Sequence, residues 1–439
     1  MELKTLNTYS VTKYGGLTFD CKCGRMHTLE TNAVFFESNA MDKLCVALET
    51  CASPLSLAFV ITEKSIADMC DTRIDKIITR GGFRCAMHVF DKSPTASVST
   101  ADRIVVTEDA RVIVGIGGGV IADIAKYKAK QAGLPCVLVI TSPTAIGAFL
   151  PSAMLENKKI EQTYKTDAPV AVVCDTELFR LCPKKLTAAA FGGLVSKLVA
   201  LFDWRTASLI NSEYFCPELF EAALSVIDGC IDKVCASTYQ SVSLSPAVAE
   251  DNLRFSAVCA LTGSSRLTSG AETQCAYALK LLLENEEREC FLRGENEFLF
   301  SRIIMKTYKN LLGSPGSFFV PPPDNNLRLE LIAQYFGIEE KYAVEKIRPI
   351  VEARAQKLCA YKVGEYRDEL YSLACEFDMR LSRAWRPFKR IYDDDGFALE
   401  GYLDPLDVSV CLALAPDLKE KFTMLTYMKN AGLLETYLA

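Results

Sequence analysis

The sequence has few histidines and no segment typical of export. Only 2 of its 439 residues are histidine, His27 and His88, so a metal site built from several imidazoles is excluded over most of the chain. The start, with Glu2 and Lys4, lacks the basic end and apolar core of a signal peptide. We therefore expect a cytoplasmic protein in a reducing compartment. Its 18 cysteines are expected to be small buried hydrophobes or free thiols and not a disulfide framework.

The sequence also lacks a large excess of either sign of charge. The 49 basic and 55 acidic side chains give a net charge of −6, spread along the chain, which predicts no nucleic-acid partner and no anionic-membrane partner. One uncharged run, residues 131–155, is long enough to span a bilayer. Pro135, Pro143, Gly147 and Pro151 interrupt it, so a strand followed by a loop is favoured over a membrane helix.

The length and composition indicate a globular chain of two domains. Its 439 residues exceed a typical single domain, with 50% hydrophobic and 24% charged residues. In the first part, short β-rich runs alternate with helical runs, which predicts an α/β domain with a parallel sheet. The expected strands are residues 57–62, 83–90, 111–116, 135–140 and 170–174, and the expected helices are residues 66–80 and 120–132.

After Asp175 the periodicity changes to that of helices. Apolar residues recur at spacings of three and four, which predicts an all-α second domain. A Pro-rich segment, residues 313–324, is expected to be a connector. The expected helices are residues 188–204, 218–234, 247–261, 273–284, 327–335, 339–358 and 417–437.

Three consecutive glycines, Gly117 to Gly119, lie between an expected buried strand and an expected helix. Glycines at such a junction let the backbone approach a diphosphate, and the helix N-terminus supplies N–H donors and partial positive charge. The spacing differs from the usual G-x-G-x-x-G pattern, so by itself it is more often a simple tight turn than a phosphate site.

The residues around this triplet resemble a known superfamily. Residues 115–129 (GIGGGVIADIAKYKA) are similar to the GGGxxxDxxKxxA segment of iron-containing alcohol dehydrogenases, glycerol dehydrogenase and dehydroquinate synthase. The same superfamily is resembled by residues 142–144 (SPT) and 169–179 (PVAVVCDTELF). Further segments are similar to its glycerol-1-phosphate dehydrogenase branch in particular, and these are residues 19–27 (FDCKCGRMH), 190–204 (AFGGLVSKLVALFDW), 265–272 (SRLTSGAE) and 417–434 (DLKEKFTMLTYMKNAGLL).

The resemblance implies a dehydroquinate synthase-like fold. Residues 1–178 would form an α/β domain that binds NAD or NADP, and residues 179–439 a helical domain, with the active site in the cleft between them and a homodimer as the assembly. Glu63 would lie where the family places an acid for a ribose hydroxyl, although a solvated carboxylate at a helix start fits equally well. The remaining cofactor contacts implied are Gly117, Gly118, Gly119, Val120, Ile121, Ala122, Asp123, Lys126, Thr144, Ala145 and Gly147.

The implied metal site departs from the family. Its members hold a divalent ion with one Asp and two His, and by the resemblance these positions fall on Gly193, Thr273 and Arg293. Glycine offers no ligand, a threonine hydroxyl is weak and a guanidinium repels the ion, so we expect no metal. Phe149 stands where the family has a substrate-facing Asp, and Phe149, Thr273 and Gly193 are therefore expected to line a rebuilt substrate pocket. Lys197 still matches.

A second group of possible metal ligands lies near the N-terminus. Cys21, Cys23 and His27 have a loosely metal-like spacing, but three such residues on a hairpin-like turn are more often structural.

Arg293 suggests a replacement for the ion. A divalent ion with one Asp and two neutral His carries one net positive charge, and so does the set of Gly193, Thr273 and Arg293. We therefore expect Arg293, with Lys197 and Glu272, to form the catalytic group, the guanidinium stabilising an oxyanion. The alternative is that Arg293 pairs with Glu272 or Glu295 and fills an unused cleft.

Two functions remain open. One is a metal-independent NAD(P) oxidoreductase acting on a small polyol or carbonyl compound, phosphorylated or not, with the substrate near Arg293, Lys197 and Lys126. The other is a catalytically silent homologue that binds a nucleotide or sugar phosphate as a sensor or partner subunit. Lyase chemistry like that of dehydroquinate synthase is disfavoured, because that branch also depends on its metal.

Overall fold

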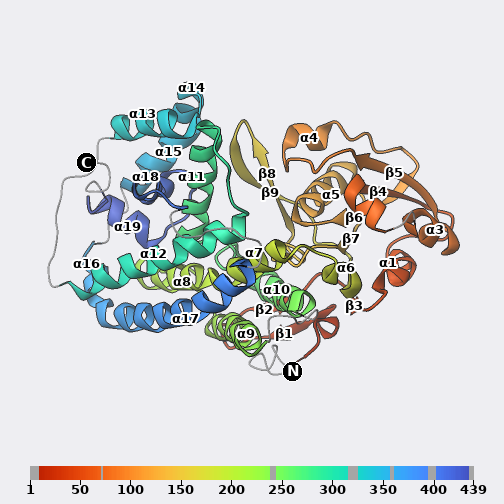
Figure 1. Cartoon of the computed structure of the whole chain (residues 1–439), viewed down its shortest axis with the longest axis horizontal. Coiled ribbons are helices and arrows are strands. Elements are labelled where there is room, and N and C mark those ends of the chain that lie inside the picture. The colour runs from red at the N-terminus through yellow and green to blue at the C-terminus, as the bar shows by residue number, and fades with distance from the viewer. Residues whose placement is uncertain are drawn as a thin grey trace. The chain divides into compact units, whose positions relative to one another are not determined.

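The computed structural model describes residues 9–70, 73–237, 244–314, 325–355, 360–393 and 402–434 (Figure 1). The chain forms two compact units, each made of two segments. The first unit comprises Met1–Ala190 and Glu221–Ser264, and the second comprises Phe191–Phe220 and Ser265–Ala439. The division after residue 178 remains a prediction.

A six-stranded parallel sheet forms the centre of the first unit. Its order is β3-β10-β7-β6-β4-β5, and every neighbouring pair is parallel. This confirms the α/β class with a parallel sheet, and all five expected strands are present. β3 was not predicted. The strands are β3 (Ala33–Glu37), β4 (Leu57–Glu63), β5 (Arg84–Phe90), β6 (Ala110–Gly117), β7 (Cys136–Ile140) and β10 (Ala171–Asp175).

Helices cover both faces of this sheet. Alternate strand residues such as Val60, Val114 and Val139 share one buried cluster with Leu44 of α1 (Leu44–Glu49) and Ile78 of α3 (Arg73–Arg80). The opposite residues of the strands face α5 (Gly119–Ala132). Burial on both faces explains why these strands are continuous apolar runs in the sequence.

Two glycines of β6 let α5 lie directly on the sheet. A Cβ added to Gly115 would lie 2.6 Å from Cβ of Ala125, and one added to Gly117 would lie 2.7 Å from Cγ1 of Ile121. Both distances are shorter than real carbon contacts, so any side chain here would push the helix away. These two glycines are therefore explained by packing.

The rest of the first unit contains two departures from the predictions. Residues 66–80 form two helices, not one, and residues 152–165 form an antiparallel hairpin in place of a loop. Lys158 and Lys159 make its two-residue turn, both with positive φ, which matches the twist of the strands. The other elements are η2 (Val11–Tyr14), β1 (Thr18–Asp20), β2 (Met26–Thr28), η3 (Ala40–Lys43), α2 (Lys64–Met69), α4 (Val98–Asp102), β8 (Ser152–Asn157), β9 (Ile160–Lys165), α6 (Thr176–Arg180) and α10 (Leu244–Thr262).

The second unit is helical, as expected. One prediction, a helix over 417–437, is wrong in part, because Thr423 caps a new helix that starts at Met424 and residues 418–423 are not helical. Residues 315–324 of the expected connector lie outside the described residues. The helices are α8 (Lys197–Asn211), α11 (Ala271–Asn285), α12 (Arg293–Gly313), α13 (Asn325–Phe336), α14 (Glu340–Tyr342), the π-helical η4 (Ala343–Ile347), α15 (Arg348–Ala355), α16 (Ala360–Glu365), α17 (Arg367–Asp393), α18 (Pro405–Leu414), η5 (Ala415–Asp417) and α19 (Met424–Asn430). Two more, α7 (Lys184–Val195) and α9 (Pro217–Ala236), have residues in both units.

One helical stretch among the described residues, Lys184–Asn211, is long and apolar enough to cross a membrane. Its most apolar 18-residue window is 94% buried inside the structure, which is what the core helix of a soluble protein shows. The run 131–155, which the sequence analysis considered, contains the end of α5, strand β7, a loop and the start of β8.

A buried carboxylate joins four helices of the second unit. Asp203 of α8 accepts hydrogen bonds from the backbone N–H of Ala271 at 2.8 Å and of Met424 at 2.9 Å, the first residues of α11 and α19. The hydroxyl of Tyr308 donates to it as well, at 3.2 Å. Burial raises the pKa of Asp203 to about 7, against the lowering effect of the two backbone donors.

The raised pKa of Asp203 predicts that the stability of the protein depends on pH. The native protein keeps the Asp203 proton up to about pH 7, whereas the unfolded chain loses it near its ordinary pKa of about 4. The free energy of unfolding therefore falls as pH rises between these values. Asp203→Asn, which does not titrate, is expected to gain stability relative to the natural protein between pH 5 and pH 8, measured as Tm. Asp91→Asn, at an exposed position, is the control, and equal pH slopes for all three proteins would contradict the prediction.

Candidate functional site

The glycine triplet lies at the carboxyl edge of the parallel sheet. β6 ends at Gly117, and Gly118 is the N-cap of α5 in an extended conformation (φ −80°, ψ −169°), with no side-chain capping bond. The first N–H groups of a helix have no partner within the helix. This junction therefore presents backbone donors and the positive end of a helix dipole at the sheet edge where α/β proteins bind ligands.

Gly118 and Gly119 differ from the glycines of β6 in what surrounds them. A Cβ on Gly118 would come no closer than 3.4 Å to another residue, at Cβ of Ser142. A Cβ on Gly119 would come no closer than 3.9 Å, at the carbonyl oxygen of Thr144. Protein packing therefore does not require glycine at these two positions. Space beside exposed backbone N–H groups is what a bound diphosphate needs, so the residues fit NAD(P).

Other predicted cofactor residues gather at the same edge. Glu63 ends β4, the neighbour of β6, and its carboxylate accepts from the hydroxyl of Ser65 at 2.8 Å. Thr144 lies in the loop after β7, with its hydroxyl 2.9 Å from that of Ser142. Ala145 is buried and Gly147 is exposed in the same loop.

The first turns of α5 divide between exposed and buried side chains. Val120 is exposed, and Ile121 and Ala122 are buried. Lys126 is buried, with its ammonium 3.0 Å from the carboxylate of Asp123. The ammonium also donates to the carbonyl oxygens of Gly147, at 3.1 Å, and Ser152. Lys126 thus fastens the loop between β7 and β8 to α5.

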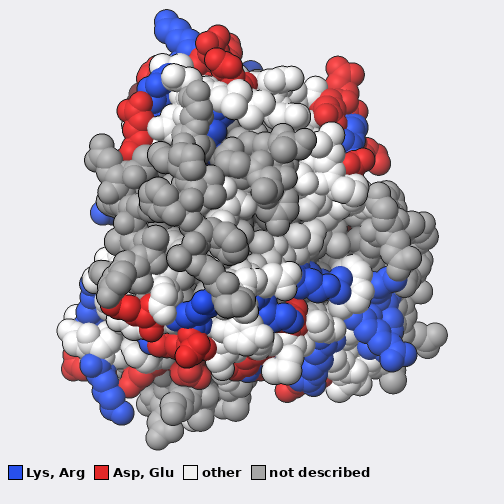
Figure 2. Space-filling model, turned by 90° about the vertical axis from the view of Figure 1, so that its left-hand side faces the viewer, with Lys and Arg blue, Asp and Glu red and all other residues white. Residues whose placement is uncertain are grey.

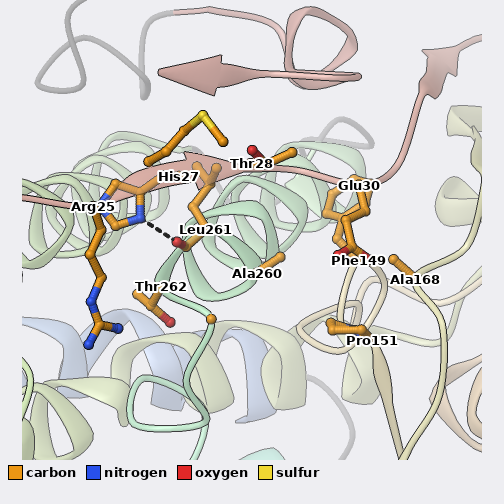
Figure 3. A pocket seen from close by; sticks show the side chains of 12 residues that line it. Arg25, His27, Thr28, Glu30, Phe149, Pro151, Ala168, Ala260, Leu261 and Thr262 are labelled. Carbon is orange, nitrogen blue, oxygen red and sulfur yellow. Dashed lines mark hydrogen bonds between the residues drawn. The ribbon is translucent and has the colours of Figure 1, made fainter. Parts of the chain in front are cut away.

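Phe149, expected in the substrate pocket, is a fully buried residue of this loop. Its backbone N–H donates to the hydroxyl of Ser256 at 3.1 Å. The residue lines a pocket of about 300 Å³ within the first unit, together with His27 and Leu261 (Figure 3).

The predicted catalytic residues of the second unit come together around one buried ammonium. Nζ of Lys197 lies 3.1 Å from the Glu272 carboxylate and 3.1 Å from the Thr273 hydroxyl. It also lies 2.7 Å from the carboxylate of Glu297, a residue of α12 that the sequence analysis missed. Both Lys197 and Glu272 are almost inaccessible to solvent.

Glu297 is also the partner of Arg293. Nε of Arg293 donates to its Oε1 at 2.9 Å, while 40% of the Arg293 side chain is exposed. The partners expected from the sequence were Glu272 and Glu295 instead. The signal was present, because Arg293 and Glu297 are four residues apart on one helix, the spacing of helical ion pairs. Gly193 completes the group, since a Cβ there would lie 3.9 Å from Oε2 of Glu297.

The charges of this cluster are mutually stabilised. Burial alone would lower the pKa of Lys197, but the carboxylates of Glu297 and Glu272 outweigh it and raise that pKa. Burial likewise would raise the pKa of Glu297, but Lys197 and Arg293 outweigh it and lower that pKa. Both shifts hold the ion pair in its charged form.

These residues do not fit the family's divalent ion. Gly193 has no side chain, Arg293 is a cation, and the Thr273 hydroxyl contacts Lys197 and Glu272. The carboxylates of Glu272 and Glu297 both face Lys197, so positive charge already occupies the cluster. A divalent ion needs carboxylate or neutral imidazole ligands that are not engaged in this way.

Figure 2 shows one face of the molecule. Both blue Lys and Arg atoms and red Asp and Glu atoms are present among its coloured side chains, and the blue ones are most numerous at the lower right. This agrees with the small net charge of −6.

Removing the buried ammonium tests its structural role. Lys197→Met leaves the carboxylates of Glu272 and Glu297 buried without their cation, which is expected to cost about 3–5 kcal/mol in the free energy of unfolding. Lys280→Met is the control, because its pair with Glu284 is longer, 3.7 Å, and more exposed, and such pairs are worth about 0–1 kcal/mol. Urea unfolding measures both, and similar losses in the two variants would contradict the assignment.

Comparison with known proteins identifies relatives of this chain. Residues 35–183 match the family model described as iron-containing alcohol dehydrogenase. The glycerol-1-phosphate dehydrogenase [NAD(P)+] of Bacillus licheniformis is 28% identical over 306 residues, which cover 67% of this chain and 75% of that enzyme. The enzyme of the same name from Hyperthermus butylicus is 29% identical over 287 residues, covering 64% of this chain and 79% of that enzyme.

Solved structures show the same fold. The archaeal alcohol dehydrogenase ADH/D1 from a Red Sea brine pool superposes with a TM-score of 0.60 at 13% sequence identity, covering 95% of this chain and 100% of that one. The six-stranded parallel sheet with a helical region is thus an architecture that this chain shares with that dehydrogenase. The family model and the two sequence relatives show that this chain is similar to iron-containing alcohol dehydrogenases and to glycerol-1-phosphate dehydrogenases.

Proposed function

We propose that this protein binds NAD or NADP at the β6–α5 junction and is a glycerol-1-phosphate dehydrogenase-like oxidoreductase. Its substrate is a small polyol or carbonyl compound, phosphorylated or not. The observation that carries the proposal is the open space at Gly118 and Gly119, where an added Cβ meets no residue within 3.3 Å. The similarity to glycerol-1-phosphate dehydrogenases that use NAD(P) supports the substrate class.

Different residues of the first unit would bind different parts of the dinucleotide. The backbone from Gly118 to Asp123 would face the diphosphate, because helix N-termini attract anions. Glu63 at the end of β4 would accept from a ribose hydroxyl, and the loop with Thr144 would lie beside the nicotinamide or adenine half. When bound, such a cofactor exchanges a hydride with a substrate carbon.

We further propose that the reaction proceeds without the family's metal. Arg293 is the partly exposed cation among the predicted catalytic residues, and it would donate to the substrate oxygen as negative charge develops there. Lys197 and Glu272 are buried, so they are proposed to position Glu297 and, through it, the guanidinium. Glu297 holds Nε of Arg293 at 2.9 Å, which fixes the direction of the side chain.

A second candidate function is favoured by the charge balance of this cluster. Lys197 and Arg293 are matched by Glu272 and Glu297, so the cluster carries no net charge, in contrast to the single positive charge counted from the sequence. A neutral cluster stabilises an oxyanion less than a cationic one. This favours a catalytically silent homologue that keeps the nucleotide site. A cytoplasmic homodimer is proposed in either case.

Nucleotide binding is tested on metal-stripped protein by thermal shift with NAD+, NADH, NADP+ and NADPH. At a hundredfold excess over Kd a binder gains about 2.7 kcal/mol of stability. Gly119→Val is expected to abolish this shift while leaving its own Tm within a few degrees, because its side chain enters the open space. Gly364→Ala, where an added Cβ meets nothing within 4 Å, is expected to keep the shift. No shift with any nucleotide in the natural protein would refute the proposal.

Turnover separates the two functions. Reduction of dihydroxyacetone phosphate or simple aldehydes by NADH or NADPH is measured with the natural protein and with Arg293→Met. Loss of an oxyanion donor is expected to lower kcat about 10²–10³-fold. Turnover that is unchanged in the variant contradicts the role of Arg293. Nucleotide binding with no turnover on any of these compounds favours the silent homologue.

A further inference from the structure

The hairpin near the N-terminus brings three soft ligands together. β1 and β2 pair antiparallel, with Phe19 opposite His27, and the loop between them carries Cys21 and Cys23. One ligand atom from each of Cys21, Cys23 and His27 can be chosen so that all lie within 4.8 Å of one another. The sequence analysis favoured a purely structural role for these residues, without an ion.

The loop conformation places the two sulphurs on one side. The N–H of Cys21 donates to the carbonyl of Arg25 at 3.1 Å, and the N–H of Gly24 donates back to the carbonyl of Cys21 at 3.0 Å. Gly24 has φ +84°, a value that glycine adopts readily, so the loop can turn tightly here. The N–H of Cys23 points to Sγ of Cys21 at 3.5 Å, a contact that stabilises a thiolate.

The orientation of His27 supplies an independent indication. Nδ1 lies 2.7 Å from the carbonyl oxygen of Leu261 (Figure 3). A carbonyl oxygen only accepts, so Nδ1 carries the proton and, in the neutral ring, Nε2 has a lone pair. Nε2 lies 3.3 Å from Sγ of Cys23. A histidine ligand usually donates its other N–H to a carbonyl or carboxylate in this way, which fixes the tautomer and the ring orientation.

The spacing and the burial of the three ligand residues both suit an ion with tetrahedral coordination. Bond lengths of about 2.3 Å to sulphur and about 2.0 Å to nitrogen place ligands roughly 3.5 Å apart in a tetrahedron, close to the Cys23–His27 separation. Cys21 and His27 are buried, and the ring of His27 packs on Phe19 with centroids 5.3 Å apart, so the ligands are held in place before an ion arrives.

We infer that Cys21, Cys23 and His27 form a zinc site that stabilises the hairpin of the first unit. Two thiolates and a neutral imidazole select a borderline-soft ion such as Zn²⁺ over Mg²⁺ or Ca²⁺. Binding releases the two thiol protons, so the thiolates balance the charge of the ion. The fourth position takes a donor from outside this loop. The site is separate from Gly193, Thr273 and Arg293, so it leaves the proposed metal-independent reaction unchanged.

Metal content and cobalt spectra test the inference. Protein refolded or purified with Zn²⁺ and then desalted is expected to retain about one equivalent. Co²⁺ in its place is expected to show the intense visible and sulphur charge-transfer bands of a tetrahedral thiolate site. Cys21→Ser/Cys23→Ser and His27→Gln are each expected to lose the retained ion and these bands. Gln at 27 still offers a donor to Leu261, which keeps the variant foldable.

Cys51→Ser/Cys85→Ser is the matched control, because it removes two partly buried thiols of the same unit and is expected to keep the metal. Nucleotide thermal shifts on all variants report the integrity of the first unit separately, so a failure of the proposed function and a failure of the zinc site are distinguishable. Less than about a tenth of an equivalent of zinc in the natural protein, or identical cobalt spectra in the natural protein and Cys21→Ser/Cys23→Ser, would overturn the inference. In that case, Cys23 and His27 form only a thiol–imidazole hydrogen bond.

Discussion

The second unit is organised around the buried ammonium of Lys197. A lone charge in an apolar interior is strongly unfavourable, so Lys197 at the start of α8 requires carboxylates from other helices. Glu272 of α11 and Glu297 of α12 meet this requirement, and both lie within 3.1 Å of Nζ. The three helices are therefore fixed in register with one another by a single group. Asp203, also on α8, accepts hydrogen bonds from the first residues of α11 and α19 and so holds the starts of these two helices.

In the metal-independent reaction proposed above, this arrangement would take the place of a divalent ion. In the family, a metal held by Asp and His supplies positive charge at this place, by the resemblance on which the assignment rests. Here, Arg293 and Lys197 supply it, and Glu297 balances it from a position 3.9 Å from where a side chain at Gly193 would begin.

The sequence predicted the parallel sheet well because its strands are buried on both faces and read as continuous apolar runs, as in β6 and β10. It missed β3, in which only Val34 is fully buried, so the strand gives a weaker signal. It merged α2 with α3 because the helical pattern continues through residues 66–80. The start of α19, which is capped by Thr423, was missed because apolar residues recur at helical spacing both before and after it.

The sequence pointed to the parts of the candidate site that depend on the backbone of a few neighbouring residues. It pointed less well to the parts that depend on contacts between side chains of different helices. Gly117, Gly118 and Gly119 were recognised together, but their different roles required the distances around each one. Glu297 was missed because its importance comes from Lys197, which is 100 residues away in the chain. His27 was recognised as a possible ligand, whereas its contact with Leu261, 234 residues later, is a tertiary contact that no local pattern reveals.

Lys126 connects several elements of the first unit. Its ammonium connects α5 to the carbonyls of Gly147 and Ser152, and Ser152 begins the hairpin of β8 and β9. The N–H of Glu156 in that hairpin donates to the carbonyl of Ala96, just before α4. These hydrogen bonds link α5, the β8–β9 hairpin and the segment before α4 into one connected part of the first unit.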